Sequence, residues 1–432
     1  MDDFIYFIQN ITFDYFIRIF WFYLIFEFTR YVVLEQIVLI IWKIKSYFQK
    51  DKYIAAKNAL WQQKPFVSII VPGKNEGKHL YKLITSLKEQ NYKNFELIVV
   101  NDGSDDQTEI IGKSYLNNGW IDKFYTNKER GGKASAANLA LRFSKGQFII
   151  HLDADCSYDS DAIEQILIPF YLYPNVGAVG GNVQVRNYNT SLATTMQGIE
   201  YQNVVGIGRI VTSELGIYKL VSGAFGAFRT DVLKRLGGWD IGPGLDGDIT
   251  VKIRKLGYNI RFASNAMCIT NAPNTFYNLG KQRRRWDKSL IRFRLRKHND
   301  VFFPNANFRW STFWGFVDNI TFNLLLDIKW IFYAVDMAIN NGYILPYIIA
   351  LNYLLYTCTN YYKLMVFSLF RERKVANVSY FFIYVPLQVI YTGYFLRAVR
   401  TYAYFKELVF KESYKDPWNP QKSSHQAEQF GL

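Results

Sequence analysis

Between residue 66 and about residue 265, short apolar runs alternate with stretches of helical periodicity. Three of the runs read FVSIIVP, FELIVVND and QFIIHLDAD, and the helical stretch KHLYKLITSLKEQ lies between the first and the second. Buried strands that alternate with helices are typical of βαβ units, whose strands are parallel. The pattern therefore predicts an α/β domain with a mostly parallel sheet, which binds its ligands at the carboxyl ends of the strands.

Acidic side chains follow two of these strands. Asp102 ends the second run, and Asp153 and Asp155 end the third with one residue between them. Residues two apart in an extended strand point to the same side, so the two carboxylates repel unless a cation or a proton lies between them. Carboxylate oxygens suit Mg²⁺ or Mn²⁺, which usually also hold substrate phosphates. The alternative interpretation is a solvated turn with capping aspartates.

Other polar residues lie where the same crevice is expected. Glu76 follows the first strand, and Lys133 follows two glycines at an expected helix start, where backbone N–H groups favour anions. Asp102 can hydrogen-bond a nucleotide base or ribose, although Asn, Asp, Gly and Ser also form ordinary turns. Asp246 and Asp248 lie in a glycine-rich loop just before a helix, where an acid is often only a cap.

The chain is strongly basic, with 51 Lys and Arg against 36 Asp and Glu, a net charge of +15. Such a balance suits anionic lipid, nucleic acid or nucleotide substrates. A nucleic-acid-binding protein would explain the charge but not the acids at successive strand ends, so we expect no nucleic-acid partner. The three cysteines are far apart, and the four histidines form no ligand cluster.

Long apolar segments flank the α/β region, at 15–43, 312–338, 344–369 and 377–399. Stretches of this length predict membrane spans. The N-terminus, MDDF, does not resemble a removable signal peptide. We therefore expect a multi-pass protein of the cell's inner (plasma) membrane, with a cytoplasmic catalytic domain. Charged residues within the first segment leave a buried amphipathic helix as the alternative.

The stretch QRRRW covers residues 282–286. Three consecutive arginines repel one another unless something anionic lies near. Two explanations are open: a basic helix face at a membrane surface, or a clamp for a phosphate-bearing substrate.

The order of these motifs resembles that of the processive family 2 glycosyltransferases, which include the poly-N-acetylglucosamine, hyaluronan, chitin-oligosaccharide and cellulose synthases. The resemblance covers roughly residues 66–300. The matching residues are Asp102, Asp153 with Asp155, Asp248, and Gln282 with Arg285 and Trp286. One departure is Gly247, which stands where the family usually has Glu before the catalytic Asp, and it leaves Asp246 as an alternative to Asp248.

The resemblance implies a GT-A-like α/β glycosyltransferase domain inserted between transmembrane and interfacial helices. It implies Asp248 as the catalytic base and Asp155 as the ligand of Mg²⁺ or Mn²⁺. The nucleotide-sugar contacts that it implies are joined by Lys133, which is expected from its place at a helix start. The full set is Glu76, Asp102, Lys133, Asp153, Gln282, Arg285 and Trp286. The expected acceptor contacts are Tyr201, Ser222, Gly223 and Trp286. Arg283 and Arg284 are expected to face lipid headgroups, with Arg292, Arg294 and Arg296 on the same basic stretch.

The function implied is that of an inverting hexosyltransferase. It would polymerise a β-linked polysaccharide from a UDP-sugar, UDP-GlcNAc or UDP-Glc, and couple synthesis to secretion. Its partners would be the UDP-sugar, the growing polysaccharide, a lipid bilayer and an accessory membrane or export subunit. The alternative is a polyprenyl-phosphate sugar transferase, which shares the aspartates and membrane helices but would not need Q-x-x-R-W.

Five regions follow from these patterns. They are an N-terminal transmembrane segment (1–45), a cytosolic catalytic domain (46–280), an interfacial Q-x-x-R-W helix region (281–308), C-terminal transmembrane helices (309–403) and a polar tail (404–432), of which residues 412–432 are expected to be flexible.

Overall fold

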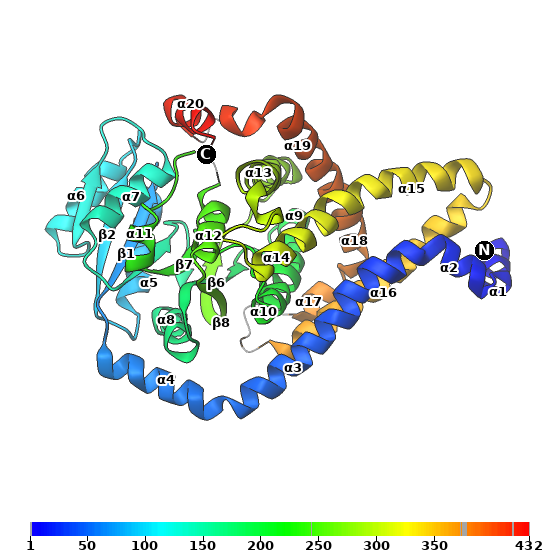
Figure 1. Cartoon of the computed structure of the whole chain (residues 1–432), viewed down its shortest axis with the longest axis horizontal. Coiled ribbons are helices and arrows are strands. Elements are labelled where there is room, and N and C mark those ends of the chain that lie inside the picture. The colour runs from blue at the N-terminus through cyan, green and yellow to red at the C-terminus, as the bar shows by residue number, and fades with distance from the viewer. Residues whose placement is uncertain (1, 243, 372, 374–377, 417–418, 432) are drawn as a thin grey trace.

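The computed structural model describes residues 2–242, 244–371, 373, 378–416 and 419–431. An eight-stranded sheet forms the centre of the α/β part, in the order β3-β2-β1-β4-β7-β6-β8-β5 (Figure 1). The strands are β1 Val67–Gly73, β2 Phe95–Asn101, β3 Lys123–Thr126, β4 Phe148–Leu152, β5 Ser157–Tyr158, β6 Val176–Val185, β7 Phe225–Arg229 and β8 Asn259–Thr270.

The sheet is mostly parallel, as predicted. Strands β3, β2, β1 and β4 run parallel to one another, and β6 is parallel to β8. Strand β7 is antiparallel to both of its neighbours, and the short β5 is antiparallel to β8. The carboxyl ends of β1, β2 and β4 therefore meet at one edge of the sheet.

Helices cover both faces of the sheet, which explains why its strands are apolar runs. Alternate residues of β1 show this: Ile69 and Val71 belong to the core cluster that contains α5 and α8 residues, and Ile70 belongs to the cluster that contains α7 and α12 residues. These helices are α5 Gly77–Lys88, α7 Lys133–Phe143, α8 Ala162–Leu172 and α12 Leu245–Lys255.

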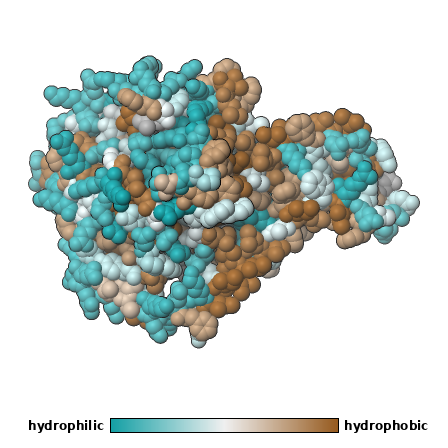
Figure 2. Space-filling view, viewed as in Figure 1, coloured by the Kyte–Doolittle hydropathy of each residue, from teal (hydrophilic) through white to brown (hydrophobic). Residues whose placement is uncertain are grey.

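The rest of the chain is helical. Next to the sheet lie α9 Leu192–Glu200, the π-helical η2 Tyr201–Ile207 and α10 Gly208–Glu214. Three further helices pack against one another: α13 Phe276–Ser289, η3 Leu290–Lys297 and α19 Arg397–Phe410. Helices α2 Phe13–Phe22, α15 Leu326–Asn340 and α16 Leu345–Phe370 extend away from the α/β part in Figure 1. Hydrophobic side chains gather on this helical side of the molecule, as Figure 2 shows.

The structure contradicts the predicted membrane spans in the part of the chain that it describes. Among the residues that the structure describes, no helix has both the length and the hydropathy that crossing a membrane requires. This finding contradicts the predicted multi-pass localisation. Polar residues also interrupt the apolar segments: Arg30 pairs with Asp318 at 2.9 Å and with Glu35 at 3.2 Å, and α16 carries Asn352 and Asn360 among its apolar residues.

The polar tail is folded, in contrast to the flexible tail that was predicted. After α19, a 3-10 turn η7 covers Glu412–Lys415, and helix α20 covers Gln421–Gln429. Ala427 of α20 is fully buried. Figure 1 shows α20 on the α/β part of the molecule, on the side of α7 and α13.

Candidate active site

Asp102, the first residue after β2, organises a glycine turn. Its carboxylate accepts hydrogen bonds from the backbone N–H groups of Gly131 and Gly132, both at 2.8 Å, and from Nδ2 of Asn127 at 3.0 Å. Gly132 has a φ of 93°, which favours glycine. Helix α7 begins at the next residue, Lys133. Asp102 therefore shapes the loop from which Lys133 projects.

Lys133 forms an ion pair with Asp153. Burial alone would lower the pKa of Lys133, but the negative charges of Asp153, Asp246 and Asp155 outweigh it and raise that pKa. The same lysine lowers the pKa of Asp153, against the effect of burial. The predicted anion-binding lysine and the first aspartate of the DxD motif are thus in direct contact.

Three carboxyl groups gather at this edge of the sheet. Burial, followed by the charges of Asp155 and Asp153, raises the pKa of Glu76 to about 7. Asp155 also accepts a hydrogen bond from the thiol of Cys156 at 3.3 Å. Within the described parts of the chain, no three His, Cys, Asp or Glu side chains are grouped closely enough to hold a metal ion by themselves. A cation here would need oxygens from the substrate as further ligands.

Asp248 lies away from this cluster, in the interior. It is 2% exposed and pairs with Lys297 at 2.7 Å and with Nε2 of His298 at 2.8 Å. Although burial opposes ionisation, the His298 bond and the Lys297 charge lower the pKa of Asp248. Its carboxylate joins the start of α12 to the end of η3.

Asp246 faces the cluster instead. Its Oδ2 accepts a hydrogen bond from the backbone N–H of Gly223 at 2.7 Å. Burial raises the pKa of Asp246, Lys133 opposes this rise, and Asp153 adds to it. Asp246 is therefore within electrostatic reach of the Lys133–Asp153 pair.

The position of Asp246 requires a residue without a side chain at position 223. A Cβ on Gly223 would come within 2.7 Å of Oδ1 of Asp246. Its neighbour Ser222 accepts a hydrogen bond from the N–H of Ala224 at 3.3 Å. Of the predicted acceptor residues, the structure thus brings Gly223 directly to an acid of the cluster.

Helix α13 presents the Q-x-x-R-W residues. Burial lowers the pKa of Arg285, and the charges of Asp416, Asp153 and Asp246 oppose that shift. Arg285 therefore lies in the same electrostatic environment as the DxD motif. Trp286 is 39% exposed. Gln282 has a buried Oε1 with no hydrogen-bond partner among the described residues.

The neighbouring Arg283 does not face lipid headgroups, in contrast to the expectation. It forms a two-pronged ion pair with Glu200, at 2.7 and 2.9 Å, and Glu200 also accepts the hydroxyl of Tyr391 at 2.7 Å. The Arg283 guanidinium lies 4.9 Å from the centre of the Trp286 ring. Glu200 is the residue before Tyr201, so this pair connects α13 to the predicted acceptor segment.

The other arginines of the basic stretch also have protein neighbours. Arg292 is 2% exposed, and Arg296 pairs with Glu407 at 3.0 Å. The guanidinium of Arg294 lies 5.7 Å from the ring of Phe316. The expectation of a lipid-facing basic surface is therefore wrong for these residues.

Sequence reasoning missed the C-terminal segment as part of the site. The hydroxyl of Ser423 in α20 donates to the carbonyl oxygen of Gly131 at 2.9 Å. Pro420 lies against Gly132, where an added Cβ would be 3.2 Å from Cδ of the proline. No local pattern could have indicated contacts across 292 positions of sequence.

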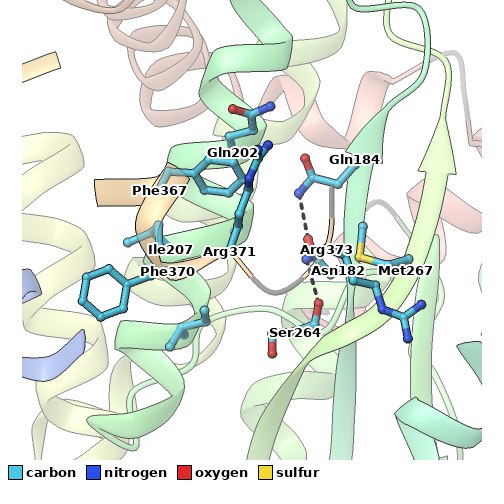
Figure 3. Close-up of a pocket in the computed structure, with 12 residues that line it drawn as sticks. Asn182, Gln184, Gln202, Ile207, Ser264, Met267, Phe367, Phe370, Arg371 and Arg373 are labelled. Carbon is cyan, nitrogen blue, oxygen red and sulfur yellow. Dashed lines mark hydrogen bonds between the residues drawn. The ribbon is translucent and has the colours of Figure 1, made fainter. Parts of the chain in front are cut away.

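A separate pocket lies between β6, β8, η2 and the end of α16 (Figure 3). Asn182 and Gln184 line it from β6, and Nε2 of Gln184 donates to Oδ1 of Asn182 at 2.8 Å. Gln202 and Phe367 line it from the helical side. None of the predicted site residues lines this pocket.

Residues 68–237 match the family model "Glycosyl transferase family 2". The chain is 31% identical over 262 residues to a poly-beta-1,6-N-acetyl-D-glucosamine synthase of Staphylococcus epidermidis, covering 59% of this chain and 63% of the relative. It is 34% identical over 215 residues to the synthase of the same name from Staphylococcus aureus (strain COL), covering 49% and 51%. The chain thus spans between half and two thirds of the length of these relatives.

Among solved structures, the fold is similar to that of the mannosyltransferase PcManGT from Pyrobaculum calidifontis, solved in complex with GDP-Man and Mn²⁺. The TM-score is 0.54 at 20% identity, covering 88% of this chain and 100% of the other. The predicted GT-A-like α/β fold is therefore confirmed.

Proposed function

We propose that this chain, whose residues 68–237 form a family 2 glycosyltransferase domain, transfers a hexose from a UDP-sugar to a growing β-linked polysaccharide. The similarity to poly-β-1,6-N-acetylglucosamine synthases favours UDP-GlcNAc as the donor over UDP-Glc. The observation that carries the proposal is the position of Asp246, a partly buried acid that is bonded to the N–H of Gly223 and within electrostatic reach of Lys133 and Asp153.

Asp246 is the base in this proposal. It takes the proton of the acceptor hydroxyl as that oxygen forms a bond to the anomeric carbon of the donor. The bond from the anomeric carbon to the diphosphate breaks, and its electron pair leaves with UDP. Attack from the opposite face inverts the anomeric centre, so an α-linked donor forms a β-linkage. The raised pKa of Asp246 suits a base better than the lowered pKa of Asp248.

Lys133 and Arg285 bind the diphosphate. Both cations lie near Asp153, and their charges stabilise the negative charge that grows on the leaving group. Asp153 orients Lys133 through the ion pair between them. Asp102 holds the glycine loop that begins α7, where backbone N–H groups favour phosphate.

Asp155 would hold Mg²⁺ or Mn²⁺ together with the diphosphate. The negative charges of Asp155 and Asp153 raise the pKa of Glu76, and this repulsion among neighbouring carboxyl groups fits a divalent cation. When bound, the cation neutralises the charge of the diphosphate. The similar mannosyltransferase fold was solved with Mn²⁺, which favours the same chemistry here.

In this proposal the growing saccharide binds next to α13. Trp286 offers a partly exposed aromatic face to a sugar ring, and its neighbour Arg283 joins it to Glu200 and so to Tyr201. Gly223 borders Asp246, and Ser222 precedes it in the chain, so we assign both to the acceptor side of the proposed base.

The first test compares two isosteric variants. Asp246→Asn keeps the size of the side chain but cannot take a proton, so we expect UDP release from UDP-GlcNAc and acceptor to fall by roughly a hundredfold or more. Its UDP-sugar affinity and unfolding temperature should stay close to those of the unmodified protein.

Asp248→Asn is the matched control. It removes the charge that Lys297 and His298 contact, but Lys297 keeps its ion pair with Asp240 at 2.6 Å. We therefore expect a loss of stability below the roughly 3–5 kcal/mol of a broken buried ion pair, and near-normal turnover per folded molecule at low temperature. Inactive, folded Asp248→Asn together with active Asp246→Asn would assign the base to Asp248 instead.

Metal dependence and product are tested on the purified chain. EDTA should abolish UDP release, and Mg²⁺ or Mn²⁺ should restore it. Linkage-specific hydrolases should degrade the product, which identifies it as a polysaccharide. Turnover undiminished in EDTA would remove the cation from the proposal, and a sugar recovered only on a polyprenyl phosphate would replace the polysaccharide acceptor by a lipid.

A further inference from the structure

His151 is a buried histidine beneath the proposed base. It lies on β4, is 1% exposed, and its ring packs 5.6 Å from that of Trp239. Its Nδ1 is 2.6 Å from the carbonyl oxygen of Gly223. A carbonyl oxygen can only accept, so the proton of the ring is on Nδ1 and His151 is the donor.

The other ring nitrogen supports this tautomer. Nε2 of His151 is buried and has no hydrogen-bond partner among the residues that the structure describes. At a buried Nε2 without a partner, an unprotonated nitrogen costs less free energy than an N–H group or a positive charge. Burial, with the nearby charge of Lys133, also lowers the pKa of His151 to about 4. The ring is thus a neutral, single-donor group at physiological pH.

Gly223 connects His151 to Asp246 through two hydrogen bonds. The carbonyl of Gly223 accepts from His151, and its N–H donates to Oδ2 of Asp246 at 2.7 Å. The backbone at Gly223 has no side chain that could fix it, and any Cβ would collide with Asp246. Its orientation therefore depends on hydrogen bonds from its surroundings.

Two neighbouring bonds show that the segment is held from several sides. Tyr158 donates its hydroxyl to the carbonyl of Ala224 at 2.8 Å, and the N–H of Val221 donates to the hydroxyl oxygen of Thr250 at 3.0 Å. Neither bond is made to Gly223 itself. The Gly223 carbonyl oxygen accepts from His151, and the N–H of the same peptide, that of Ala224, donates to Oγ of Ser222 at 3.3 Å. The N–H of Gly223 belongs to the preceding peptide, whose carbonyl oxygen, on Ser222, accepts from the N–H of Phe225 at 3.2 Å. The bond from His151 therefore adds to these contacts and limits rotation of the backbone at Gly223.

We propose that His151 is a positioning residue for the transfer reaction, which orients the Gly223 backbone so that its N–H holds the carboxylate of Asp246 toward the acceptor hydroxyl. The inference rests on the proposed role of Asp246 as base. His151 itself touches no reacting group. A shift of the base by about 1 Å is enough to cost on the order of 100-fold in rate.

The test compares a variant that keeps the donor with one that removes it. In His151→Asn the side-chain amide nitrogen occupies the place of Nδ1 and can still donate to Gly223. In His151→Leu no donor remains, while the volume is similar. We expect His151→Leu to lower kcat by roughly 10- to 100-fold with UDP affinity within twofold of the unmodified protein, and His151→Asn to recover most of the rate. Equal losses in the two variants, or a normal kcat in His151→Leu, would overturn the proposal.

A double variant separates this inference from the proposed function. In the Asp246→Asn background the base is already absent, so His151→Leu should cause no further loss of the residual rate. A further loss of the same factor would show that His151 acts independently of Asp246 and overturn the inference. Normal activity of Asp246→Asn alone would instead reject the proposed base. His151→Met, with its adaptable side chain, replaces His151→Leu if the leucine variant does not fold.

Discussion

At the scale of single residues, Asp246 and Asp248 show how two acids on one helical turn acquire different chemistry. Both lie in the first turn of α12. Residues two apart are about 200° apart around a helix, so they cannot face the same neighbour. One carboxylate meets Lys297 and His298, and the other faces Lys133 and Asp153. Burial raises the pKa of Asp246, whereas the bonded partners His298 and Lys297 lower the pKa of Asp248.

Glu76 makes the stability of the protein depend on pH. Its pKa in the fold is about 7, above the ordinary value of 4.5, so the folded protein keeps this carboxyl protonated where the unfolded chain has lost the proton. The stability it contributes is complete below pH about 4.5 and is lost as the pH rises toward 7. We expect Glu76→Gln to be more stable than the unmodified protein at pH 8, by up to about 3 kcal/mol, with no difference near pH 4.5.

Unfolding temperatures between pH 4.5 and 8.5 in metal-free buffer measure this difference. Glu109→Gln is the control, because Glu109 is an exposed partner of Lys113 and should show no such trend. A Glu76→Gln variant that is less stable at pH 8 would mean that Glu76 is held ionised by a partner.

At the scale of elements, neighbouring residues in one turn of α13 have different surroundings. Arg283 is used in the ion pair with Glu200, Arg285 lies near the acids of the DxD motif, and Trp286 stays partly exposed. Successive residues of a helix point about 100° apart, so adjacent side chains of QRRRW reach different surroundings. The consecutive arginines are thus separated by geometry, and acids balance Arg283 and Arg285.

Trp286 and Arg285 should therefore have separable effects. Trp286→Ala removes a sugar platform but no charge, so we expect polymer length and acceptor-dependent rate to fall while UDP affinity is unchanged. Arg285→Ala should weaken UDP binding as well, because it removes a cation from the diphosphate site. Product sizing and UDP titration measure the two effects, with Trp286→Phe as the aromatic control. Normal polymer from Trp286→Ala would exclude the sugar-stacking role.

At the scale of the whole molecule, the C-terminal segment closes over the loop that Asp102 organises. Ser423 bonds Gly131, and Pro420 lies against Gly132. Glu412 pairs with Lys288 of α13 at 2.6 Å, which connects the same segment to the Q-x-x-R-W helix. The C-terminal segment thus contacts both α7 and α13, the two sides of the proposed donor site.

Removal of residues 420–432 should loosen the glycine loop. We expect the KM for UDP-GlcNAc to rise several-fold and amide exchange at residues 127–134 to become faster, because the loop loses its cover. Ser423→Ala should show a smaller effect of the same sign. Ser424→Ala is the control, since the hydroxyl of Ser424 is buried with no hydrogen-bond partner among the described residues. Faster turnover after the deletion would show that the segment obstructs the site.

The sequence by itself determined the mostly parallel sheet and the edge at which Glu76, Asp102, Asp153 and Asp155 lie. Apolar runs of strand length alternating with helices leave few arrangements, and in a parallel sheet the residues after neighbouring strands must meet at one edge. Lys133 was predictable for the same reason, because the helix start after a strand lies at that edge.

Only the tertiary structure decided which aspartate faces the site, where Arg283 points and where the tail lies. Each depends on a partner far away in the sequence: Lys297 and His298 for Asp248, Glu200 for Arg283, and Gly131 for Ser423. The structure also overturned the predicted membrane spans. Periodicity records which face of an element is apolar, but not which distant charge or carbonyl satisfies a polar group, because that choice is made by packing between elements.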